Sequence, residues 1–414
     1  MIAHIKPSHI AGKVTVPPSK SMAHRALISS SLAAGTSIIR NISLSGDISA
    51  TVSCLRALGA GITLTGTTAE VVGFDPFAGG GRITLDARES GSTLRFLIPL
   101  CLLSGRECEI TGSPRLLERP LDDYKNICRK YGFRFDVGSK SVTVSGRLRP
   151  DRYEVSGESS SQFASGLMFA LPLLDGDSEI VMTGKVESKP YIKMTSAVLA
   201  GFGIKAEYDG DARVVIPGKQ RYKTADFTVE GDASAAAFFD AFNLLGGDVT
   251  TVGVNGQTAQ GDIIYREYFR RIGDGAPLPL DDCPDLAPVM FALAAERGGC
   301  AFTGTRRLAF KESDRATAMA EELSKFGAEL VINDDSVIVR GGSLHAPTVV
   351  LSSHNDHRVA MALSVLLTKY GGTIDGCEAA NKSMPDFFDR IVKLGGDVTV
   401  EQKSARAASK ECVD

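Results

Sequence analysis

Two cations and a hydroxyl stand at the start of a segment that otherwise has the composition of a buried helix. The run VPPSKSMAHRALISSSLAAGTS, residues 16–37, places Lys20, Ser21 and Arg25 ahead of small and apolar side chains. A positive charge at a helix N-terminus opposes the helix dipole, so these cations are unfavourable there unless an anion binds them. Because the first backbone N–H groups of a helix also attract anions, we expect an anionic ligand at this end.

Other small, apolar segments begin in a similar way. Their opening residues are Ser90, Gly91 and Ser92; Ser160, Ser161 and Gln162; Asp285; and His357 with Arg358. If several such helix starts converge on one cleft, the cleft binds anions before any side chain is counted. Ser and Asp are also ordinary N-cap residues, and capping alone accounts for any single position. It is the recurrence that favours a shared ligand site.

Three charged motifs lie outside those segments. KESDR carries Lys311 and Arg315 one helical turn apart with Glu312 between them, a spacing that predicts a common face. A solvated ion-pair face is the alternative interpretation of this motif. SPRLLERP supplies Arg119, and NKSMPDFF supplies Lys382 ahead of a proline that can start a helix.

The elements that must position these residues form a repeat of two alternating helix types. One type is apolar nearly all round, which predicts a core position; its copies are residues 21–37, 90–105, 160–177, 232–248, 285–299 and 356–372. The other is amphipathic and ends near a glycine, a typical C-terminal stop; its copies are residues 47–62, 121–135, 191–206, 262–275, 315–330 and 385–400. Short alternating strands such as KSVTVSG fill the gaps. The sequence thus predicts six α/β units, three in each half of the chain.

The length of 414 residues favours two domains. We expect residues 18–224 to form one domain of three units, and residues 1–17 with 225–414 to form the second, with hinges near 17 and 225. In this arrangement the N-terminal strand IAHIKPS pairs within the second domain.

Composition excludes several classes of partner. A net charge of −3 argues against nucleic acid or an anionic membrane as the main partner. No apolar run approaches the ~18 residues of a membrane span, and MIAHIKPSHI lacks the apolar stretch of a signal peptide, so we expect a cytoplasmic protein. The eight cysteines show no CxxC pair and no zinc spacing, which predicts reduced thiols and no metal site. The polar tail from Glu401 onward is expected to fray.

The ordered motifs VPPSKSxxxRAL, SGSTxRFL, ERPLDD, SSSQF, SKPY, PDLAP, FKESDR, NDHRxAM and KSMPDFF resemble the 5-enolpyruvylshikimate-3-phosphate synthase family of enolpyruvyl transferases. This resemblance spans residues 14–390. It implies a cofactor-free transfer of the carboxyvinyl group of phosphoenolpyruvate to the 5-hydroxyl of shikimate 3-phosphate, in aromatic amino-acid biosynthesis. It further implies a monomer, sensitivity to glyphosate-like compounds, and a two-domain inside-out α/β barrel with three βαβαββ units per domain around buried helices.

The resemblance also assigns roles to matching positions. For shikimate 3-phosphate these are Lys20, Ser21, Arg25, Ser160, Ser161, Gln162, Ser188, Tyr191, Asp285 and Lys311. For phosphoenolpyruvate they are Lys20, Gly91, Arg119, Gln162, Arg315, Arg358 and Lys382. Asp285 matches the proton acceptor at the hydroxyl, Glu312 matches the proton donor to the methylene, and Lys20 is expected to assist at the bridging oxygen or the leaving phosphate.

Three positions of this site depart from the family pattern. Glu89 stands where the family commonly has Asn, and Ser92 replaces a Thr; we expect the added carboxylate to pair with Arg88 or Arg95. Arg307 lies where the family often has an Asn that contacts the phosphate of shikimate 3-phosphate.

Three alternatives stay open. The sister transferase that acts on UDP-N-acetylglucosamine shows Lys-Asn at the first helix and usually a Cys in the loop matching GSPRLLERP; this chain has Lys20-Ser21 and no Cys there. A phosphate-binding or RNA-end-processing relative without this chemistry would not need both Asp285 and Glu312. A pure scaffold predicts no domain closure on ligands.

Overall fold

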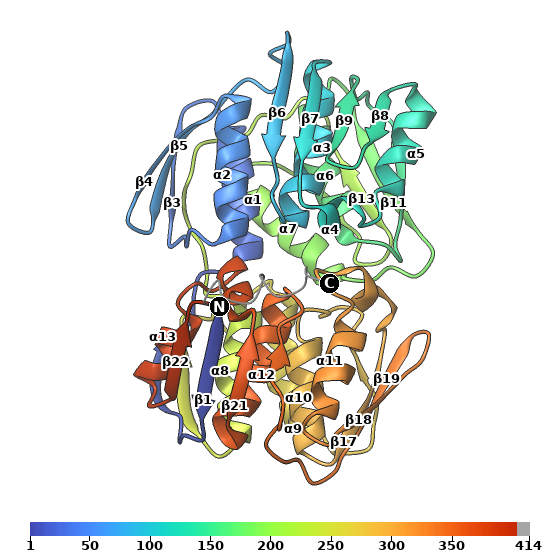
Figure 1. Ribbon diagram of the computed structural model, residues 1–414. Helices are drawn as coiled ribbons and strands as arrows, with labels where there is room; N and C mark the ends of the chain where they lie inside the picture. Colours follow the sequence, from blue (N-terminus) through green and yellow to red (C-terminus); the bar gives the residue numbers. More distant parts are fainter. Residues whose placement is uncertain (404–414) are drawn as a thin grey trace, which may run out of the picture.

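The computed structural model describes residues 1–403, which form two halves stacked one above the other (Figure 1). Each half has its own hydrophobic core. In the first half the core residues run from Met22 to Val229. In the second half they come from the two separate stretches 3–16 and 235–394. Apolar side chains thus divide the chain into two bodies, and the chain passes between these bodies twice.

The repeating unit is a four-stranded sheet with two helices. Its clearest copy runs β6 (Arg82–Asp86), α3 (Gly91–Ser104), β7 (Glu107–Thr111), α5 (Asp122–Tyr131), β8 (Arg134–Val137) and β9 (Ser141–Ser145). The strands lie in the order β6-β7-β9-β8, and only β6 and β7 are parallel. Since parallel neighbours need a crossover connection, α3 bridges this pair, whereas β8 and β9 follow each other as a hairpin.

Two further units keep this plan within one continuous stretch. The first is β10 (Arg152–Ser156), α6 (Ser161–Ala170), β11 (Ser178–Thr183), α7 (Lys189–Gly201), β12 (Glu207–Tyr208) and β13 (Arg213–Ile216). The second is β16 (Leu278–Pro279), α10 (Ala287–Glu296), β17 (Gly299–Thr303), α11 (Arg315–Ser324), β18 (Glu329–Ile332) and β19 (Ser336–Arg340).

Two units take a strand from a distant part of the chain. The first sheet holds β3 (Thr36–Arg40), β4 (Gly61–Thr65) and β5 (Thr68–Val72), with α1 (Lys20–Ser31) and α2 (Gly46–Leu58), and β14 (Asp226–Thr228) pairs with β3. The last sheet holds β20 (Leu351–Ser352), β21 (Gly372–Asp375) and β22 (Asp397–Glu401), with α12 (His357–Tyr370) and α13 (Phe387–Lys393). Here β1 (Ile2–Lys6) lies between β21 and β22, which confirms the expected pairing of the N-terminal strand.

The sixth unit is reduced to two parallel strands, β2 (Ala11–Thr15) and β15 (Asp248–Val252), with α8 (Ala233–Leu244) and α9 (Tyr265–Arg271). Six α/β units are therefore present, as the sequence predicts. The predicted boundary at residue 225 falls too early, because β14 still belongs to the first half through its ladder with β3, and the chain crosses over after Thr228. Hinge motion at the two crossings stays a prediction.

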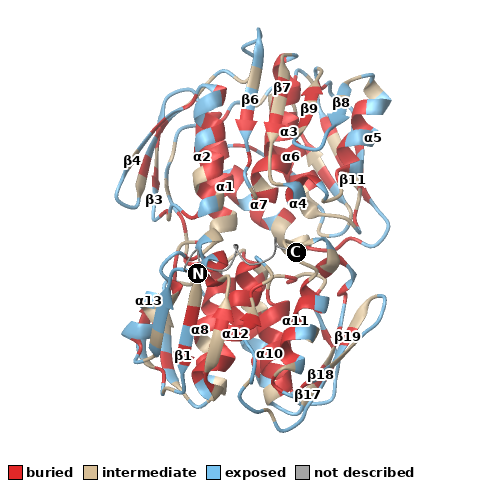
Figure 2. Cartoon of the chain, in the orientation of Figure 1, coloured by how far each residue is buried: buried red, intermediate tan, exposed pale blue. Residues whose placement is uncertain are grey.

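Three of the six apolar helices fill the interior of each half, as the burial colours show (Figure 2). In α10 every residue from Ala287 to Ala295 is buried. Side chains cap five of these six helices by accepting a hydrogen bond from a first-turn N–H; the caps are Ser19, Ser90, Ser160, Asp232 and Asp356. The amphipathic helices α2 and α5 end at Gly59 and Gly132 in the left-handed conformation, a C-terminal stop that favours glycine.

No helix in residues 1–403 is long and apolar enough to cross a membrane. The cysteines of this part of the chain are free and buried, whereas Cys412 and most of the polar tail lie outside the described residues.

The packing of α3 against α6 leaves no room at Gly166. A Cβ there would lie 2.2 Å from the Tyr124 hydroxyl and 2.6 Å from the Arg95 carbonyl oxygen. We expect Gly166→Ala to lower the free energy of unfolding by about 2 kcal/mol, since overpacking at the upper end of its usual ~1–3 kcal/mol range outweighs the ~1 kcal/mol that helix propensity returns. Urea unfolding followed by circular dichroism measures this change.

The matched control is Gly342→Ala, because Gly342 has no heavy atom near its Cβ position and no positive φ. Its unfolding midpoint should match that of the wild type. Equal midpoints for both variants would contradict close packing at Gly166.

Candidate active site

A cavity of about 320 Å³ lies between the two halves. The starts of several core helices line it. They contribute Lys20 and Ser21 from α1, Gly91 and Ser92 from α3, Ser161 from α6 with its cap Ser160, His357 from α12, and Asp285 two residues before α10. Ser188, which precedes α7 with a left-handed φ of 58°, adds a further hydroxyl. The structure thus brings together helix starts from distant parts of the sequence.

Cationic side chains outnumber carboxylates around this cavity. The cations are Lys20, Arg25, Arg95, Arg119, Arg306, Arg307 and Lys311, and the carboxylates are Asp47, Glu158, Asp285 and Glu312. Helix N-termini add partial positive charge to this excess. The cavity is therefore suited to ligands that carry several negative charges.

One buried guanidinium holds the two expected acid–base residues. Arg315 is 1% exposed and donates to Asp285 Oδ1 at 2.8 Å and to Glu312 Oε2 at 2.9 Å. Its third partner is Asp356, which is 0% exposed and accepts from the Arg315 Nε at 2.9 Å. Arg315 is the first residue of α11, so Lys311 and Glu312 lie in the non-helical segment before that helix. The predicted common helical face is wrong, and ion pairs rather than helix spacing bring these residues together.

Charge sets the protonation of this group. Although burial favours the neutral acid, Lys311, Arg315 and Arg358 hold the pKa of Asp285 well below its usual range. Burial opposes ionisation of Glu312 as well, but Arg315 and the cations around it keep its pKa well below its usual range. Burial lowers the pKa of Lys311 to about 8, even though Asp285 lies 3.5 Å from its ammonium group and favours the charged form.

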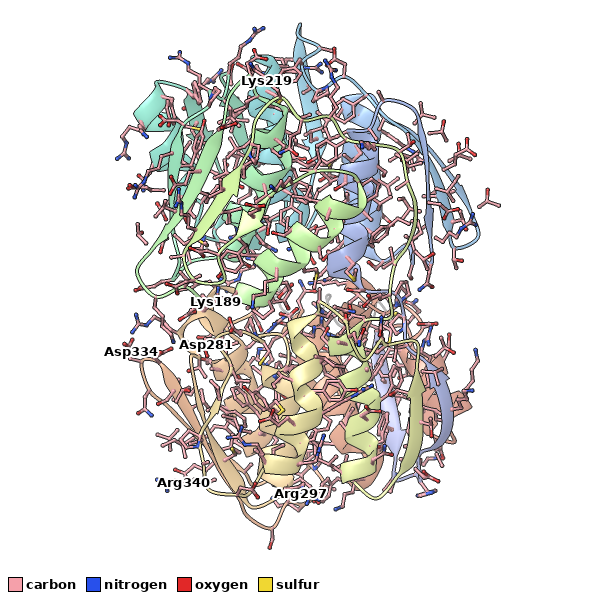
Figure 3. All side chains as sticks on the ribbon, turned by 180° about the vertical axis from the view of Figure 1, so that it is seen from behind. Lys189, Lys219, Asp281, Arg297, Asp334 and Arg340 are labelled. Carbon is pink, nitrogen blue, oxygen red and sulfur yellow. The ribbon has the colours of Figure 1, made fainter. Side chains whose placement is uncertain are left out.

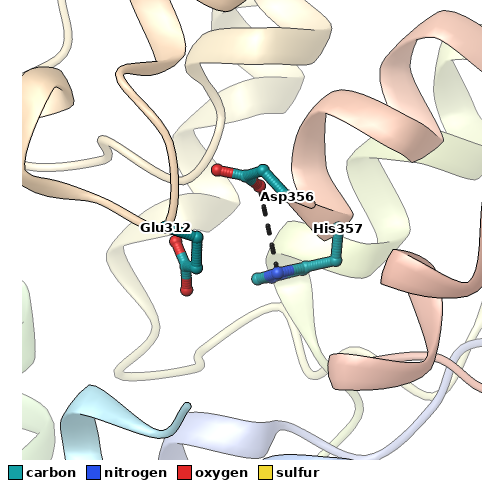
Figure 4. Close-up of side chains that lie close together, drawn as sticks. All are labelled: Glu312, Asp356 and His357. Atoms are coloured by element: carbon teal, nitrogen blue, oxygen red, sulfur yellow. Dashed lines mark ion pairs between the residues drawn. The ribbon is translucent and has the colours of Figure 1, made fainter. Parts of the chain in front are cut away.

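His357 faces Glu312 from the first turn of α12, beside Asp356 (Figure 4). Its Nδ1 lies 3.9 Å from Asp356 Oδ1, and neither ring nitrogen has a hydrogen-bond partner. Burial and then the charge of Lys20 lower its pKa well below the usual range, so the ring is neutral. These three side chains could offer ligand atoms to a metal ion, but Arg315 already binds both carboxylates.

Lys20 enters the cavity paired with a carboxylate of the next helix. Its Nζ lies 2.8 Å from Oδ2 of Asp47, in the first turn of α2. Burial would lower the pKa of Lys20, but Asp47 and Glu312 together raise it. Lys20 is therefore a cation in this setting.

Arg25 and Tyr191 lie together on the floor of the cavity. The Arg25 guanidinium donates to the Thr195 hydroxyl at 2.7 Å and to the Tyr191 carbonyl at 3.2 Å, over the face of Phe96. The Tyr191 hydroxyl donates to Asp262 Oδ2 at 2.9 Å. These contacts fix the arginine before any ligand is bound.

The hydroxyls of Ser160, Ser161 and Ser188 line the cavity. Arg307 reaches Ser188 from the second half, near Asp281, which Figure 3 labels at the boundary between the halves. Arg307 donates to the Ser159 carbonyl at 2.8 Å and to the Ser188 hydroxyl, and its Nε lies 2.6 Å from Glu187 Oε2. The Arg307 and Glu187 side chains are only 10% and 7% exposed. This pair joins the two halves and places a cation beside the serines.

Arginine side chains contact both Gln162 and Gly91. The Gln162 Oε1 accepts from Arg95 at 2.9 Å and its Nε2 donates to the Ser92 hydroxyl at 3.0 Å. A Cβ on Gly91 would lie 2.6 Å from the Arg119 guanidinium, so the missing side chain leaves room for that arginine.

The expected partner of Glu89 is wrong. Glu89 binds neither Arg88 nor Arg95; its Oε2 lies 2.6 Å from Nζ of Lys382 in the second half, and its Oε1 accepts from the Asn355 side chain at 3.2 Å. Lys382 also donates to the Asn355 carbonyl. An oppositely charged group was available across the cleft, which sequence proximity does not reveal.

Three expected ligand residues lie behind the cavity wall rather than on it. They are Arg315, Arg358 and Lys382. Arg358 lies 3.4 Å from Asp285 Oδ2 and donates to the Ser234 hydroxyl. The motifs did not predict a place in or beside the cavity for three further residues, which are Asp47, Glu187 and Arg95. Glu187 directly precedes the SKPY motif, and Arg95 lies within SGSTLRFL.

The buried pair of Arg307 and Glu187 predicts a large stability effect. Glu187→Gln leaves the Arg307 charge buried without its carboxylate, so we expect the free energy of unfolding to fall by about 3 kcal/mol. Asp226→Asn is the control, because it breaks the exposed pair with Arg40 and should cost at most about 1 kcal/mol. Thermal and urea unfolding of both variants measure the difference, and a similar small effect in both would contradict the buried pair.

Comparison with known proteins places this chain among enzymes of one activity. The family model of EPSP synthase (3-phosphoshikimate 1-carboxyvinyltransferase) matches residues 5–276 and 270–391. A 3-phosphoshikimate 1-carboxyvinyltransferase of Clostridium novyi is 37% identical over 95% of this chain and 97% of its own length. The corresponding protein of Brachyspira hyodysenteriae is 36% identical over 96% of this chain and 100% of its own length.

Solved structures share the fold. EPSP synthase from Acinetobacter baumannii superposes with a TM-score of 0.78 at 23% identity, covering 97% of this chain and 100% of the other. The enolpyruvyl transferase NikO from Streptomyces tendae gives a TM-score of 0.74 at 16% identity, covering 96% and 98%. These likenesses confirm the two-domain inside-out α/β barrel. With the family model and the relatives spanning nearly the whole chain, the protein belongs to the EPSP synthase (3-phosphoshikimate 1-carboxyvinyltransferase) family.

Proposed function

We propose that the cavity between the halves carries out the reaction of the family, transfer of the carboxyvinyl group of phosphoenolpyruvate to the 5-hydroxyl of shikimate 3-phosphate with release of phosphate. One observation carries the assignment of the chemistry to named residues. Asp285 and Glu312 share the guanidinium of Arg315 inside a cavity that is otherwise rich in cations. Two carboxylates in one enclosed site can serve as acid and base.

Shikimate 3-phosphate occupies the first-half side of the cavity. Its phosphate lies at the hydroxyls of Ser160, Ser161 and Ser188 with Gln162 and Tyr191, and its carboxylate lies at Ser21 and Arg25. Lys311 contributes its charge to this ligand from the second half. Arg25 supports this placement because its contacts to Thr195 and Tyr191 already orient the guanidinium for a planar anion.

Phosphoenolpyruvate lies between Lys20, Gly91, Gln162 and Arg119 on one side and the second half on the other. Arg315, Arg358 and Lys382 stand behind this position and contribute positive charge. Each of these three cations already has a carboxylate partner, so it acts on the substrate through its field unless that partner moves.

The reaction then proceeds by addition and elimination. Glu312 delivers a proton to the methylene carbon of phosphoenolpyruvate, and C2 becomes cationic. The 5-hydroxyl attacks C2 while Asp285 accepts its proton, which gives a tetrahedral phospho-ketal. Glu312, now a carboxylate, takes a proton back from the new methyl group as the bond from C2 to the phosphate oxygen breaks. Phosphate leaves, and Lys20 stabilises the charge on that leaving group.

Arg315 and the cations around it hold the pKa of Glu312 well below the usual range, so this carboxyl group is ionised among the protein's own charges. Two anionic substrates bring negative charge next to it and expel water, and both effects raise the pKa of a carboxyl group. Glu312 therefore becomes a proton donor only in the loaded site.

A cytoplasmic location and a monomeric state remain predictions.

The decisive experiment measures phosphate released from phosphoenolpyruvate, with shikimate 3-phosphate and separately with UDP-N-acetylglucosamine. Release should depend on shikimate 3-phosphate. We expect Asp285→Asn and Glu312→Gln to lower kcat by about 100-fold or more, the usual size of a general acid–base contribution, while calorimetry still detects binding of shikimate 3-phosphate. Full turnover in both variants, or release with the UDP-sugar alone, would overturn the assignment.

The pKa of Lys311 predicts a pH limit on substrate capture. Since burial lowers this pKa to about 8, the free enzyme carries the lysine charge below pH 8 and loses it above. We expect kcat/KM for shikimate 3-phosphate, which reports the free enzyme, to fall as the pH rises through about 8. Lys311→Arg keeps its charge at these pH values and should lack this descending limb. An unchanged limb in Lys311→Arg would assign it to another group.

A further inference from the structure

Arg115 of the first half donates hydrogen bonds to the main chain of the second half beside the cavity. The guanidinium of Arg115 donates to the carbonyl oxygens of Ala309 at 3.1 Å, Lys311 at 3.2 Å and Glu312 at 3.3 Å. Arg115 belongs to the short helix α4 (Pro114–Leu117). The carbonyl of Ala309 belongs to the 3-10 helix Arg306–Phe310, and those of Lys311 and Glu312 belong to the segment that joins this helix to α11. The contact is therefore made only while the two halves lie together.

The segment that Arg115 contacts, residues 309–312, carries two side chains that the proposed mechanism uses. From the same residues, the Lys311 ammonium reaches towards Asp285 at 3.5 Å and the Glu312 carboxylate reaches Arg315 at 2.9 Å. Lys311 caps the 3-10 helix by donating its N–H to the Leu308 carbonyl at 3.4 Å, and Glu312 lies between that helix and α11, so helical hydrogen bonds fix this backbone only in part. Arg115 supplies anchoring from the opposite half.

Helix α4 connects the hydrogen bonds of Arg115 to the part of the cavity wall that Arg119 forms. Leu116 and Leu117 are buried in the first core, and the Ser113 hydroxyl accepts from the Leu116 N–H at 3.3 Å, so α4 is fixed to the first half. Arg119 follows directly, and its guanidinium lies against Gly91 in the cavity wall. One short segment thus carries an arginine that faces the cavity and an arginine that holds the opposite half.

We infer that Arg115 is a positioning residue, which engages residues 309–312 when the halves close and so sets the distance from Glu312 to a substrate held at Arg119. This inference rests on the proposed role of Glu312. The three acceptors of Arg115 are neutral carbonyls, so these hydrogen bonds involve none of the carboxylates that balance the charge of the cavity. Closure can then position Glu312 without changing the charges that substrates meet.

The test compares Arg115→Gln with Arg56→Gln. Arg56 also donates to a main-chain carbonyl, that of Ile62, but within the first half. We expect Arg115→Gln to lower kcat by about tenfold, since a misplacement of an ångström can cost up to ~100-fold, with KM for shikimate 3-phosphate little changed. The solvent deuterium isotope effect on kcat should rise, because proton donation by Glu312 becomes more rate-limiting. Arg115→Lys, which keeps a donor, should recover part of the rate.

Three outcomes decide the inference. A lower kcat with a larger isotope effect in Arg115→Gln, and neither change in Arg56→Gln, supports it. A kcat for Arg115→Gln within twofold of Arg56→Gln overturns it, as does a lower kcat with an unchanged isotope effect, which reports lost folded enzyme. Glu312→Gln tests the role of Glu312 separately: if that variant loses turnover while Arg115→Gln does not, only the positioning role fails.

Discussion

The fully buried guanidinium of Arg315 is the charge on which the site depends. Removing such a charge from water is unfavourable unless opposite charges and hydrogen bonds replace the solvent. Asp285, Glu312 and Asp356 provide this compensation, and each comes from a different segment of the second half. The demand of one cation for partners thus fixes the loops that precede α10, α11 and α12, and with them the two carboxylates assigned to proton transfer.

The same rule extends across the cavity. Cations that await anionic ligands are neutralised by carboxylates of the chain itself; the pairs are Lys20 with Asp47, Arg307 with Glu187, and Lys382 with Glu89. The last two pairs join the halves. Glu89 therefore acts as an internal anion next to the site, and a bound substrate has to compete with it or share its lysine. These pairs stabilise the charged groups around the cavity at some cost to substrate affinity.

Much of this molecule could be predicted from periodicity and helix starts. The alternation of apolar and amphipathic segments predicts twelve of the thirteen α-helices in residues 1–403, because burial on every side and burial on one side leave different patterns. The short helix α4 lies outside this alternation and was not predicted. The polar starts of α1, α3 and α6 predict a shared cleft. Long-range partners could not be predicted: the contact of Glu89 with Lys382 and that of Arg307 with Glu187 depend on how the halves approach each other. The strand β14 was assigned to the wrong half because a short strand carries too little pattern to show its partner.

The position of β1 has a consequence for biosynthesis. This strand lies between β21 and β22, so residues 2–6 wait for residues 372–375 and 397–401 before their sheet can form. The first half needs nothing beyond Val229 for its core and can fold while the rest is still being made. The last sheet of the second half instead closes around β1 only after β21 and β22 are made, with high contact order and correspondingly slow assembly. Until that moment β1 is an unpaired edge, whereas β2 can pair with β15 much earlier.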